Sequence, residues 1–292
     1  MSHVLTLVAA RDATTLSPAI IARVREAVGG GTPDILSPGE AVDIPVAALP
    51  DRDAVRAALA GAPIDAVAIP GAGRRKALLL ADMDSTIVTS ETLDELADFA
   101  GLKATVAAIT ARAMNGELDF QEALRERVAM LRGLPIEALA QTWERVRLTP
   151  GARELVATMR KHGATTALVS GGFTFFSGRV AAAVGFDIHR ANVLLDDGTA
   201  LTGAVGEPIL DRTTKLDLLH ELAAAGGLPL SATLAVGDGA NDLPMLREAG
   251  LGVAFRAKPV VAAEARAHVD HADLRALLFL QGYHAAEIEA AD

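Results

Sequence analysis

The feature that most constrains the fold is a short, wholly apolar run, Ala77–Ala81, that ends at Asp82. A strand without a polar position has both faces buried, which is typical of a parallel sheet covered by helices on each side. Further strand-like runs at residues 165–170, 233–237 and 251–255 are separated by segments with helical periodicity. This alternation indicates βαβ units, so we predict an α/β fold with a doubly wound parallel sheet.

Two segments depart from this alternation. Residues 4–70 follow a βαββαβ pattern, which predicts a smaller α+β domain of ferredoxin-like type over residues 1–72. Residues 91–147 show only helical periodicity, so we expect a helical cap at about 90–148. The cap is expected to be an insertion in a catalytic domain that spans 73–292, and a hairpin is expected around residues 196–198.

Composition excludes several classes of function. With 27 basic and 37 acidic residues, the net charge of −10 provides no basic surface for a nucleic-acid backbone. The absence of cysteine excludes thiolate nucleophiles and zinc–thiolate sites, so any metal must be held by oxygen or imidazole. No apolar run approaches the roughly 18–20 residues that cross a bilayer, and the N-terminus lacks a basic leader. We therefore expect a cytoplasmic protein that binds neither nucleic acid nor membrane.

Polar residues follow three of the predicted strands directly. Asp82 and Asp84 follow the first, Ser170 and Gly171 end the second, and the run 238–242 follows the third. Because ligands bind beyond the carboxyl ends of parallel strands, we expect these groups to converge. Each has an ordinary alternative explanation, since Asp is common in turns and helix caps and glycine in tight turns.

Taken together and in this order, the features resemble the haloacid dehalogenase (HAD) superfamily. Its four short motifs match Asp82-Met-Asp-Ser-Thr86, Ser170, Lys215 and Gly237-Asp-Gly-Ala-Asn-Asp242. Within that superfamily the chain is most similar to the phosphoserine phosphatases, on residues 84–91 and 120–128. The resemblance covers about residues 76–280. It implies hydrolysis of O-phosphoserine to serine and phosphate through an aspartyl phosphate, the last step of serine biosynthesis.

The resemblance also implies a role for each matching residue. Asp82 would be the nucleophile and Asp84 the general acid and base. The magnesium site would be formed by Asp82, Asp238 and the backbone carbonyl of Asp84, with support from Asp242. The substrate-binding residues would be Glu91, Met114, Phe120, Arg127, Ser170, Gly171, Lys215 and Asn241.

Elementary electrostatics agrees with these roles. A phosphate dianion repels a carboxylate, so Mg²⁺ and the Lys215 ammonium are needed before the attack becomes feasible. We expect the carboxylate two positions away, on Asp82, to raise the pKa of Asp84, which would allow Asp84 to protonate the leaving oxygen. Arg127 can bind a substrate carboxylate through two parallel hydrogen bonds, while Glu91 accepts from an ammonium group. On this stretch Arg125 and Arg132 are alternatives to Arg127.

Several alternatives stay open from the sequence. A related phosphotransferase would pass the phosphoryl group from phosphoserine to another alcohol, and a decayed enzyme would be a non-catalytic amino-acid sensor. Residues 1–72 resemble an ACT domain, which implies an amino-acid effector or contacts in a homodimer. The preference between L- and D-phosphoserine is not set by these motifs.

Overall fold

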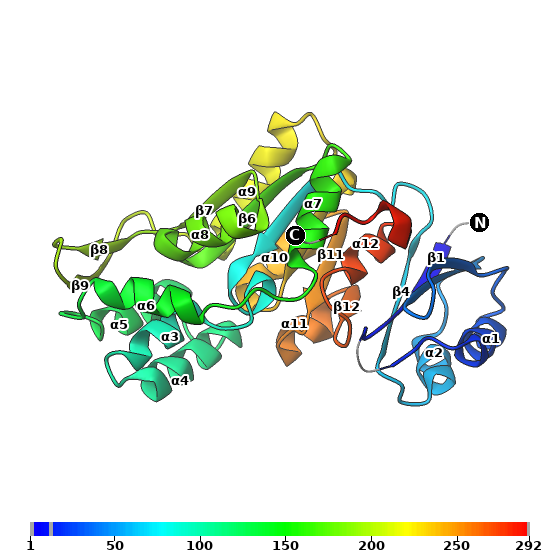
Figure 1. Cartoon of the computed structure of the whole chain (residues 1–292), viewed down its shortest axis with the longest axis horizontal. Coiled ribbons are helices and arrows are strands. Elements are labelled where there is room, and N and C mark those ends of the chain that lie inside the picture. Colours follow the sequence, from blue (N-terminus) through cyan, green and yellow to red (C-terminus); the bar gives the residue numbers. More distant parts are fainter. Residues whose placement is uncertain (1–2, 12–13, 291–292) are drawn as a thin grey trace.

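The computed structural model describes residues 3–11 and 14–290, so the outermost residues of the expected ranges 1–72 and 73–292 lie outside it. Two main sheets organise the chain, with a helical layer beyond the larger one (Figure 1). The smaller sheet is made by the N-terminal segment. Its elements are β1 (His3–Ala9), α1 (Pro18–Ala27), β2 (Asp34–Ser37), β3 (Ala41–Val46), α2 (Arg52–Leu59) and β4 (Ile64–Pro70).

The strands of the N-terminal sheet are antiparallel and lie in the order β2-β3-β1-β4. This is the split βαβ arrangement of a ferredoxin-like fold, and it confirms the βαββαβ order expected from the sequence. One face of the sheet packs against α1 and α2 through Leu5, Leu7 and Ile44. The opposite face points toward the rest of the chain.

The larger sheet is parallel, six-stranded and has the order β12-β11-β10-β5-β6-β7. The doubly wound parallel sheet expected from the sequence is thereby confirmed. Its strands are β5 (Leu78–Asp82), β6 (Thr165–Phe173), β7 (Ile188–Asn192), β10 (Thr233–Gly237), β11 (Leu251–Phe255) and β12 (Ala267–Val269). The strands β6 and β10 flank β5, so the chain reverses its direction of progress across the sheet beside β5, which is where ligands bind in such folds.

Helices cover both faces of this sheet, because successive residues of each strand point to opposite sides. Leu79 belongs to one hydrophobic cluster and Leu78 and Leu80 to another. The helices of the first cluster are α7 (Ala152–Lys161), α8 (Thr174–Val184) and α12 (Ala276–Leu280). Those of the second are α9 (Arg212–Ala225), α10 (Leu243–Glu248) and α11 (Pro259–Glu264). All five residues of β5 are buried, as its apolar sequence predicts.

The segment between β5 and α7 forms a helical layer beyond the carboxyl ends of the strands (Figure 1). Its helices are α3 (Thr92–Asp98), α4 (Lys103–Met114), α5 (Phe120–Ala129) and α6 (Glu137–Arg145). The hairpin of β8 (Leu194–Asp196) and β9 (Leu201–Val205) packs against α5. Backbone hydrogen bonds of 2.8–2.9 Å join Leu201 to Gly133 and Leu134. The layer is therefore built from two separate insertions, whereas the sequence suggested helices alone.

Buried polar contacts attach the N-terminal sheet to the larger part of the chain. The Arg74 guanidinium donates to Asp43 Oδ1 at 3.1 Å, to Thr6 Oγ1 at 3.1 Å and to the Leu280 carbonyl at 3.0 Å. On β4, the Asp65 carboxylate accepts backbone N–H bonds from the three residues 270–272. Apolar residues of the same face, including Val8, join the main hydrophobic cluster.

None of the helices in the described ranges combines the length and apolar character that crossing a membrane requires.

Candidate active site

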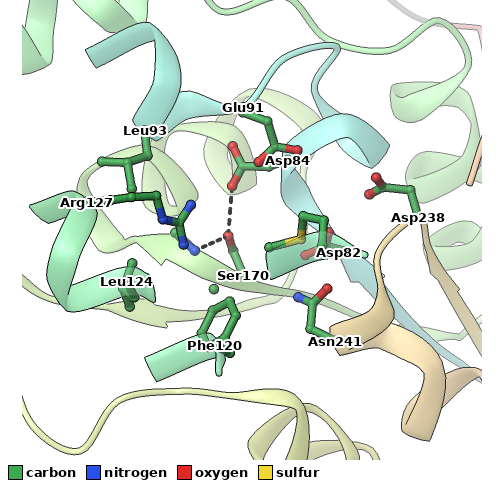
Figure 2. Close-up of a pocket in the computed structure, with 13 residues that line it drawn as sticks. Asp82, Asp84, Glu91, Leu93, Phe120, Leu124, Arg127, Ser170, Asp238 and Asn241 are labelled. Atoms are coloured by element: carbon green, nitrogen blue, oxygen red, sulfur yellow. Dashed lines mark hydrogen bonds between the residues drawn. The ribbon is translucent and has the colours of Figure 1, made fainter. Parts of the chain in front are cut away.

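A pocket opens where the carboxyl ends of β5, β6 and β10 face the helical layer (Figure 2). The strand β5 ends at Asp82, β6 carries Ser170, and the loop after β10 carries Asp238 and Asn241. The convergence expected from the sequence therefore occurs. The lining residues are Asp82, Asp84, Glu91, Leu93, Met114, Phe120, Leu124, Arg127, Ser170, Gly171, Gly172, Asp238 and Asn241.

A sharp turn after β5 separates the two aspartates of the first motif. It is closed by Ser85, a non-glycine residue held at φ 56°, in the left-handed region. The Asp84 carboxylate accepts from the backbone N–H of Thr92 at 2.7 Å. It also accepts from Ser170 Oγ at 3.2 Å (Figure 2). Burial, and then the negative charge of Glu91 rather than that of Asp82 as expected from the sequence, raise the pKa of Asp84 to about 7. A carboxyl group with this pKa can both give and take a proton near neutral pH.

Two glycine residues near the end of β6 make room for the pocket. A Cβ atom on Gly172 would lie 2.8 Å from Asp84 Oδ2, and one on Gly171 would lie 2.6 Å from the ring of Phe120. Both approaches are shorter than ordinary van der Waals contact. The Gly172 N–H also donates to Ser170 Oγ at 2.8 Å, which fixes the hydroxyl between the loop and Asp84. The glycines are therefore required by the close approach of Asp84 and Phe120.

Lys215 links two carboxylates beneath the pocket. Its ammonium donates to Asp82 Oδ1 and to Asp242 Oδ1, each at 2.6 Å, and the lysine is 2% exposed. Burial by itself would lower the pKa of Lys215, but the charges of Asp242 and Asp82 outweigh it, so the pKa is raised and the ammonium stays charged. Lys215 lies in the first turn of α9, where a lysine is usually solvated, but here its side chain is buried.

Asp242 holds the loop after β10 in place. Its Oδ2 accepts from the backbone N–H groups of Asp238 and Gly239 at 3.1 and 3.0 Å. A Cβ atom on Gly237 would lie 2.4 Å from this carboxyl group, so glycine is needed there. Burial, followed by the charge of Asp242, raises the pKa of Asp82 well above its ordinary value, and Lys215 opposes that effect. The cluster carries more negative than positive charge.

The acidic cluster has the properties of a hard-cation site. Oxygen atoms of Asp82, Asp238 and Asp242 all lie within 4.8 Å of one another. Asp238 Oδ1 accepts from Thr86 Oγ1 at 3.1 Å, whereas the buried Oδ2 accepts no hydrogen bond from any described residue. The Lys258 ammonium lies 3.5 Å from that Oδ2. An unsatisfied carboxylate oxygen in an all-oxygen donor set fits a divalent cation such as Mg²⁺.

The other end of the pocket is formed by the helical layer. Glu91, at the start of α3, accepts from Ser85 Oγ at 2.7 Å. Arg127 on α5 is 3% exposed and lies across the pocket from Asp238 in Figure 2. Of the two alternatives to Arg127, Arg125 is exposed and paired with Glu207 at 2.9 Å, and Arg132 is exposed. Among these three arginines only Arg127 lines the pocket.

The structure brings together all the residues singled out in the sequence, with two distinctions. Lys215 and Asp242 lie behind Asp82 rather than on the pocket wall, and the Asp84 side chain lies outside the acidic cluster. The sequence alone did not indicate a site role for Leu93, Leu124 or Gly172. The two leucines follow helical spacing, and this pattern is the same for a pocket wall as for a core.

Known proteins are similar to this chain in sequence and in architecture. A family model described as haloacid dehalogenase-like hydrolase matches residues 79–247. Phosphoserine phosphatase from Streptomyces coelicolor is 45% identical over 239 residues, which are 82% of this chain and 58% of that protein. The chain spans little more than half the length of several curated relatives that it matches, this one included.

Two solved structures are also similar. One, described as a phospho-aspartyl intermediate analogue of phosphoserine phosphatase, is 41% identical, with a TM-score of 0.67 over 70% of this chain and 98% of that chain. The other, a probable phosphoserine phosphatase from Vibrio cholerae in unliganded form, is 33% identical. Its TM-score is 0.78, over 98% of this chain and 88% of that chain. The second similarity extends over the N-terminal sheet as well.

Proposed function

The chain belongs to the haloacid dehalogenase-like hydrolase family, and from this membership we propose that it is a magnesium-dependent phosphatase that hydrolyses O-phosphoserine. The observation that carries the proposal is the hydrogen bond from buried Lys215 to Asp82, beside an acidic cluster and opposite Arg127 and Glu91. One end of the pocket suits a phosphate group, and the other suits the charged groups of an amino acid. Relatives named phosphoserine phosphatase support this substrate.

The first half of the reaction would transfer the phosphoryl group to the protein. Asp82 would attack phosphorus through a carboxylate oxygen, and the bond between phosphorus and the seryl oxygen would break. Lys215 fixes Asp82 Oδ1 and supplies positive charge next to the transferred group. Asp84 would give its proton to the leaving seryl oxygen, for which a pKa of about 7 is well suited. The Ser170 hydroxyl and the Gly171 amide would hold phosphate oxygens.

The second half would restore the enzyme. A water molecule would attack the phosphorus of the aspartyl phosphate, Asp84 would take a proton from that water, and the bond from phosphorus to Asp82 would break. The group held by Asp82, Asp238 and the Asp84 carbonyl, with support from Asp242, would be Mg²⁺. When bound, it would supply the positive charge that allows a carboxylate to approach a phosphate dianion.

Recognition of the serine portion would fall to the helical layer. The Arg127 guanidinium would bind the substrate carboxylate and Glu91 the ammonium group, since their charges are opposite to those of the zwitterion. Phe120, Met114 and Asn241 would complete the wall around them. Asn241 Oδ1 is buried without a hydrogen bond from the described residues, so it is available as an acceptor.

We also propose a division of labour along the chain. Residues 73–292 would be the phosphatase domain, with its cap at about 90–148, and residues 1–72 an ACT-like domain. That domain would bind an amino-acid effector or contribute to a homodimer. The ferredoxin-like strand order supports the comparison with ACT domains. Titration of the full chain with serine, followed by calorimetry and by light scattering, tests both roles, and their absence would leave a purely structural one.

The proposed activity is tested by phosphate release from a panel of monoesters. With Mg²⁺, phosphoserine should be hydrolysed with a kcat/KM at least about 10-fold above that of phosphoethanolamine, which lacks the carboxylate. Equal hydrolysis of both substrates would contradict the assignment of substrate. Added homoserine should not reduce the phosphate released. A homoserine-dependent loss of released phosphate would instead identify the phosphotransferase.

A further inference from the structure

A buried chain of polar groups lies behind the pocket wall in the helical layer. Arg127 Nη1 donates to Thr110 Oγ1 at 2.9 Å, and that hydroxyl lies 2.6 Å from Asp94 Oδ1. The three residues come from three different helices, α5, α4 and α3. Thr110 is 3% exposed and Asp94 is 8% exposed. Only Arg127 of the three lines the pocket, so the mechanism proposed above leaves Asp94 and Thr110 unused.

The number of protons on each group determines which group donates in each of these hydrogen bonds. The Arg127 guanidinium can only donate, so the Thr110 oxygen accepts from Nη1. The single Thr110 proton can go to Asp94 at 2.6 Å or to the Val106 carbonyl at 3.0 Å. The carboxylate is closer and, when ionised, a stronger acceptor than a carbonyl. The hydrogen bonds therefore run from Arg127 to Thr110 and from Thr110 to Asp94.

This arrangement leaves part of the guanidinium for a ligand. Arginine has five N–H donors in a planar fork. Among the described residues, Nε–H is used by the Ala123 carbonyl at 3.1 Å and one Nη1–H by Thr110. The remaining donors are free to bind a carboxylate side by side, provided that the plane of the guanidinium is held. A contact on Nε and another on Nη1 fix that plane.

The negative charge of Asp94 also stabilises the positive charge of Arg127. Burial lowers the pKa of Arg127, and the negative charge of Asp94 is the first influence that opposes this loss. Burial raises the pKa of Asp94 to about 6, which still leaves the carboxyl mainly ionised at neutral pH. A buried guanidinium without a countercharge would be costly. Asp94 is thus the fixed countercharge of Arg127 when no substrate is bound.

We propose that Asp94 and Thr110 are positioning residues, which hold the Arg127 guanidinium for a substrate carboxylate and so set selectivity for phosphomonoesters that carry one. The selectivity depends on the proposed function, whereas the positioning of Arg127 does not. Neither residue touches the reacting atoms. Their removal therefore affects binding of the carboxylate-bearing substrate and leaves the chemistry at Asp82 unchanged.

The kinetic test uses isosteric variants. Asp94→Asn and Thr110→Val should each raise KM for phosphoserine about 10-fold with little change in kcat, and leave kcat/KM for phosphoethanolamine within about 2-fold. Thr110→Ser, which keeps the hydroxyl, should behave as wild type. An equal loss on both substrates would show a merely structural role and overturn the proposal. An unchanged KM for phosphoserine would overturn it too.

Matched controls lie in the same helices or layer. Thr142 on α6 is also buried and donates to the carbonyl four residues before it, at 2.7 Å, but does not contact Arg127. Asp98 on α3 pairs with Arg145 on the exposed side of the layer. Thr142→Val and Asp98→Asn should leave the ratio of kcat/KM for the two substrates unchanged.

A second measurement needs no substrate. The Nε–H signal of Arg127 in a nitrogen–proton correlation spectrum, assigned by its loss in Arg127→Lys, reports the order of the guanidinium. Its order parameter should fall in Asp94→Asn and Thr110→Val and stay unchanged in Thr142→Val. An unchanged value in the first two variants overturns the proposal. If wild type fails to prefer phosphoserine but Asp94→Asn still disorders Arg127, the proposed function fails and the positioning of Arg127 stands.

Discussion

The two ends of the pocket are built differently. At the sheet end, Asp82 and Asp238 stand at the ends of neighbouring strands, and Lys215 binds Asp82 and Asp242 at 2.6 Å. At the cap end, Glu91 and Arg127 are carried by helices of the layer between β5 and α7. The strand ends are fixed by the hydrogen bonds of the parallel sheet, whereas the helices are held to it by side-chain packing and by the segments around Val88 and Leu148, which form an isolated bridge.

This difference places the proposed reacting groups on the sheet and the proposed substrate-recognition groups on the helical layer. Groups that must approach phosphorus in line need a rigid frame, and the sheet supplies it. Groups that recognise the rest of a substrate can sit on a part that moves over the pocket and excludes water. We therefore expect changes at the sheet end to lower kcat and changes at the cap end to raise KM.

The nucleophile should give the largest effect. Asp82→Asn keeps the size of the side chain but removes the charge that attacks phosphorus, so kcat for phosphoserine should fall by about 10⁴-fold or more. The wild-type protein should acquire a hydroxylamine-labile phosphate that this variant lacks. Asp98→Asn, on the exposed side of α3, serves as the control for the same chemical change. Turnover at the wild-type rate in Asp82→Asn would show that Asp82 is not the nucleophile.

Removal of the divalent cation should have the next largest effect. Treatment with a chelator should lower phosphate release by about 10³-fold, and Mg²⁺ should restore it, because the negative cluster otherwise repels the substrate dianion. Mg²⁺ should also raise the melting temperature of wild type more than that of Asp238→Asn, since the ion binds the folded cluster. Full activity in excess chelator would show that the sheet end works without a cation.

Arg127→Ala should change substrate binding at the cap end of the pocket. Loss of a charge-assisted contact with a substrate carboxylate is worth about 2 kcal/mol, which corresponds to a roughly 30-fold rise in KM for phosphoserine. Phosphoethanolamine kinetics should change much less. Arg125→Ala, whose side chain is exposed and paired with Glu207, should leave KM unchanged. If Arg127→Ala lowered kcat for both substrates instead, the two ends would not be separable.

The smallest effect concerns stability and pH rather than turnover. Burial raises the pKa of Asp94 to about 6 in the folded chain, above the value of 3.8 for an ordinary aspartate. The folded state then binds more protons than the unfolded state between these values, so the contribution of Asp94 to stability falls as pH rises from about 4 to about 6. A shift of this size corresponds to about 1–3 kcal/mol.

Urea unfolding at pH 4, 5 and 6 measures this contribution as the difference between wild type and Asp94→Asn. The wild type should lose stability relative to the variant as the pH increases over this interval. A constant difference would mean that Asp94 titrates as an exposed aspartate does. The cap end would then lack the buried countercharge that we assign to it.

Much of the fold could be predicted because its signals are local. The apolar run 77–81 coincides with the buried strand β5, and the motif residues follow strand ends where the sheet topology brings them together. Helical spacing placed the layer between β5 and α7 correctly. The strands β7 and β12 gave weaker signals, because β7 carries the exposed Arg190 at an edge of the sheet and β12 has only three residues.

The rest depended on contacts between distant parts of the chain. Nothing in residues 194–205 indicates that this hairpin packs against α5. Leu93 and Leu124 line the pocket although their spacing is that of a core. The chain from Arg127 through Thr110 to Asp94 is also invisible in the sequence, because it joins three helices whose relative rotation is set by tertiary packing.

The contact between Arg74 and the N-terminal sheet has a consequence for how the chain can be divided. Arg74 precedes β5 by only a few residues and joins Asp43 and Thr6 to the carbonyl groups of Phe279 and Leu280. In a shortened chain that began at β5, the main hydrophobic cluster would lose the apolar residues that the N-terminal sheet contributes to it. The carbonyl groups of Phe279 and Leu280 would also lose their hydrogen-bond donor. We therefore expect residues 78–290 to need a redesigned surface, where the first sheet now lies, before they are stable on their own.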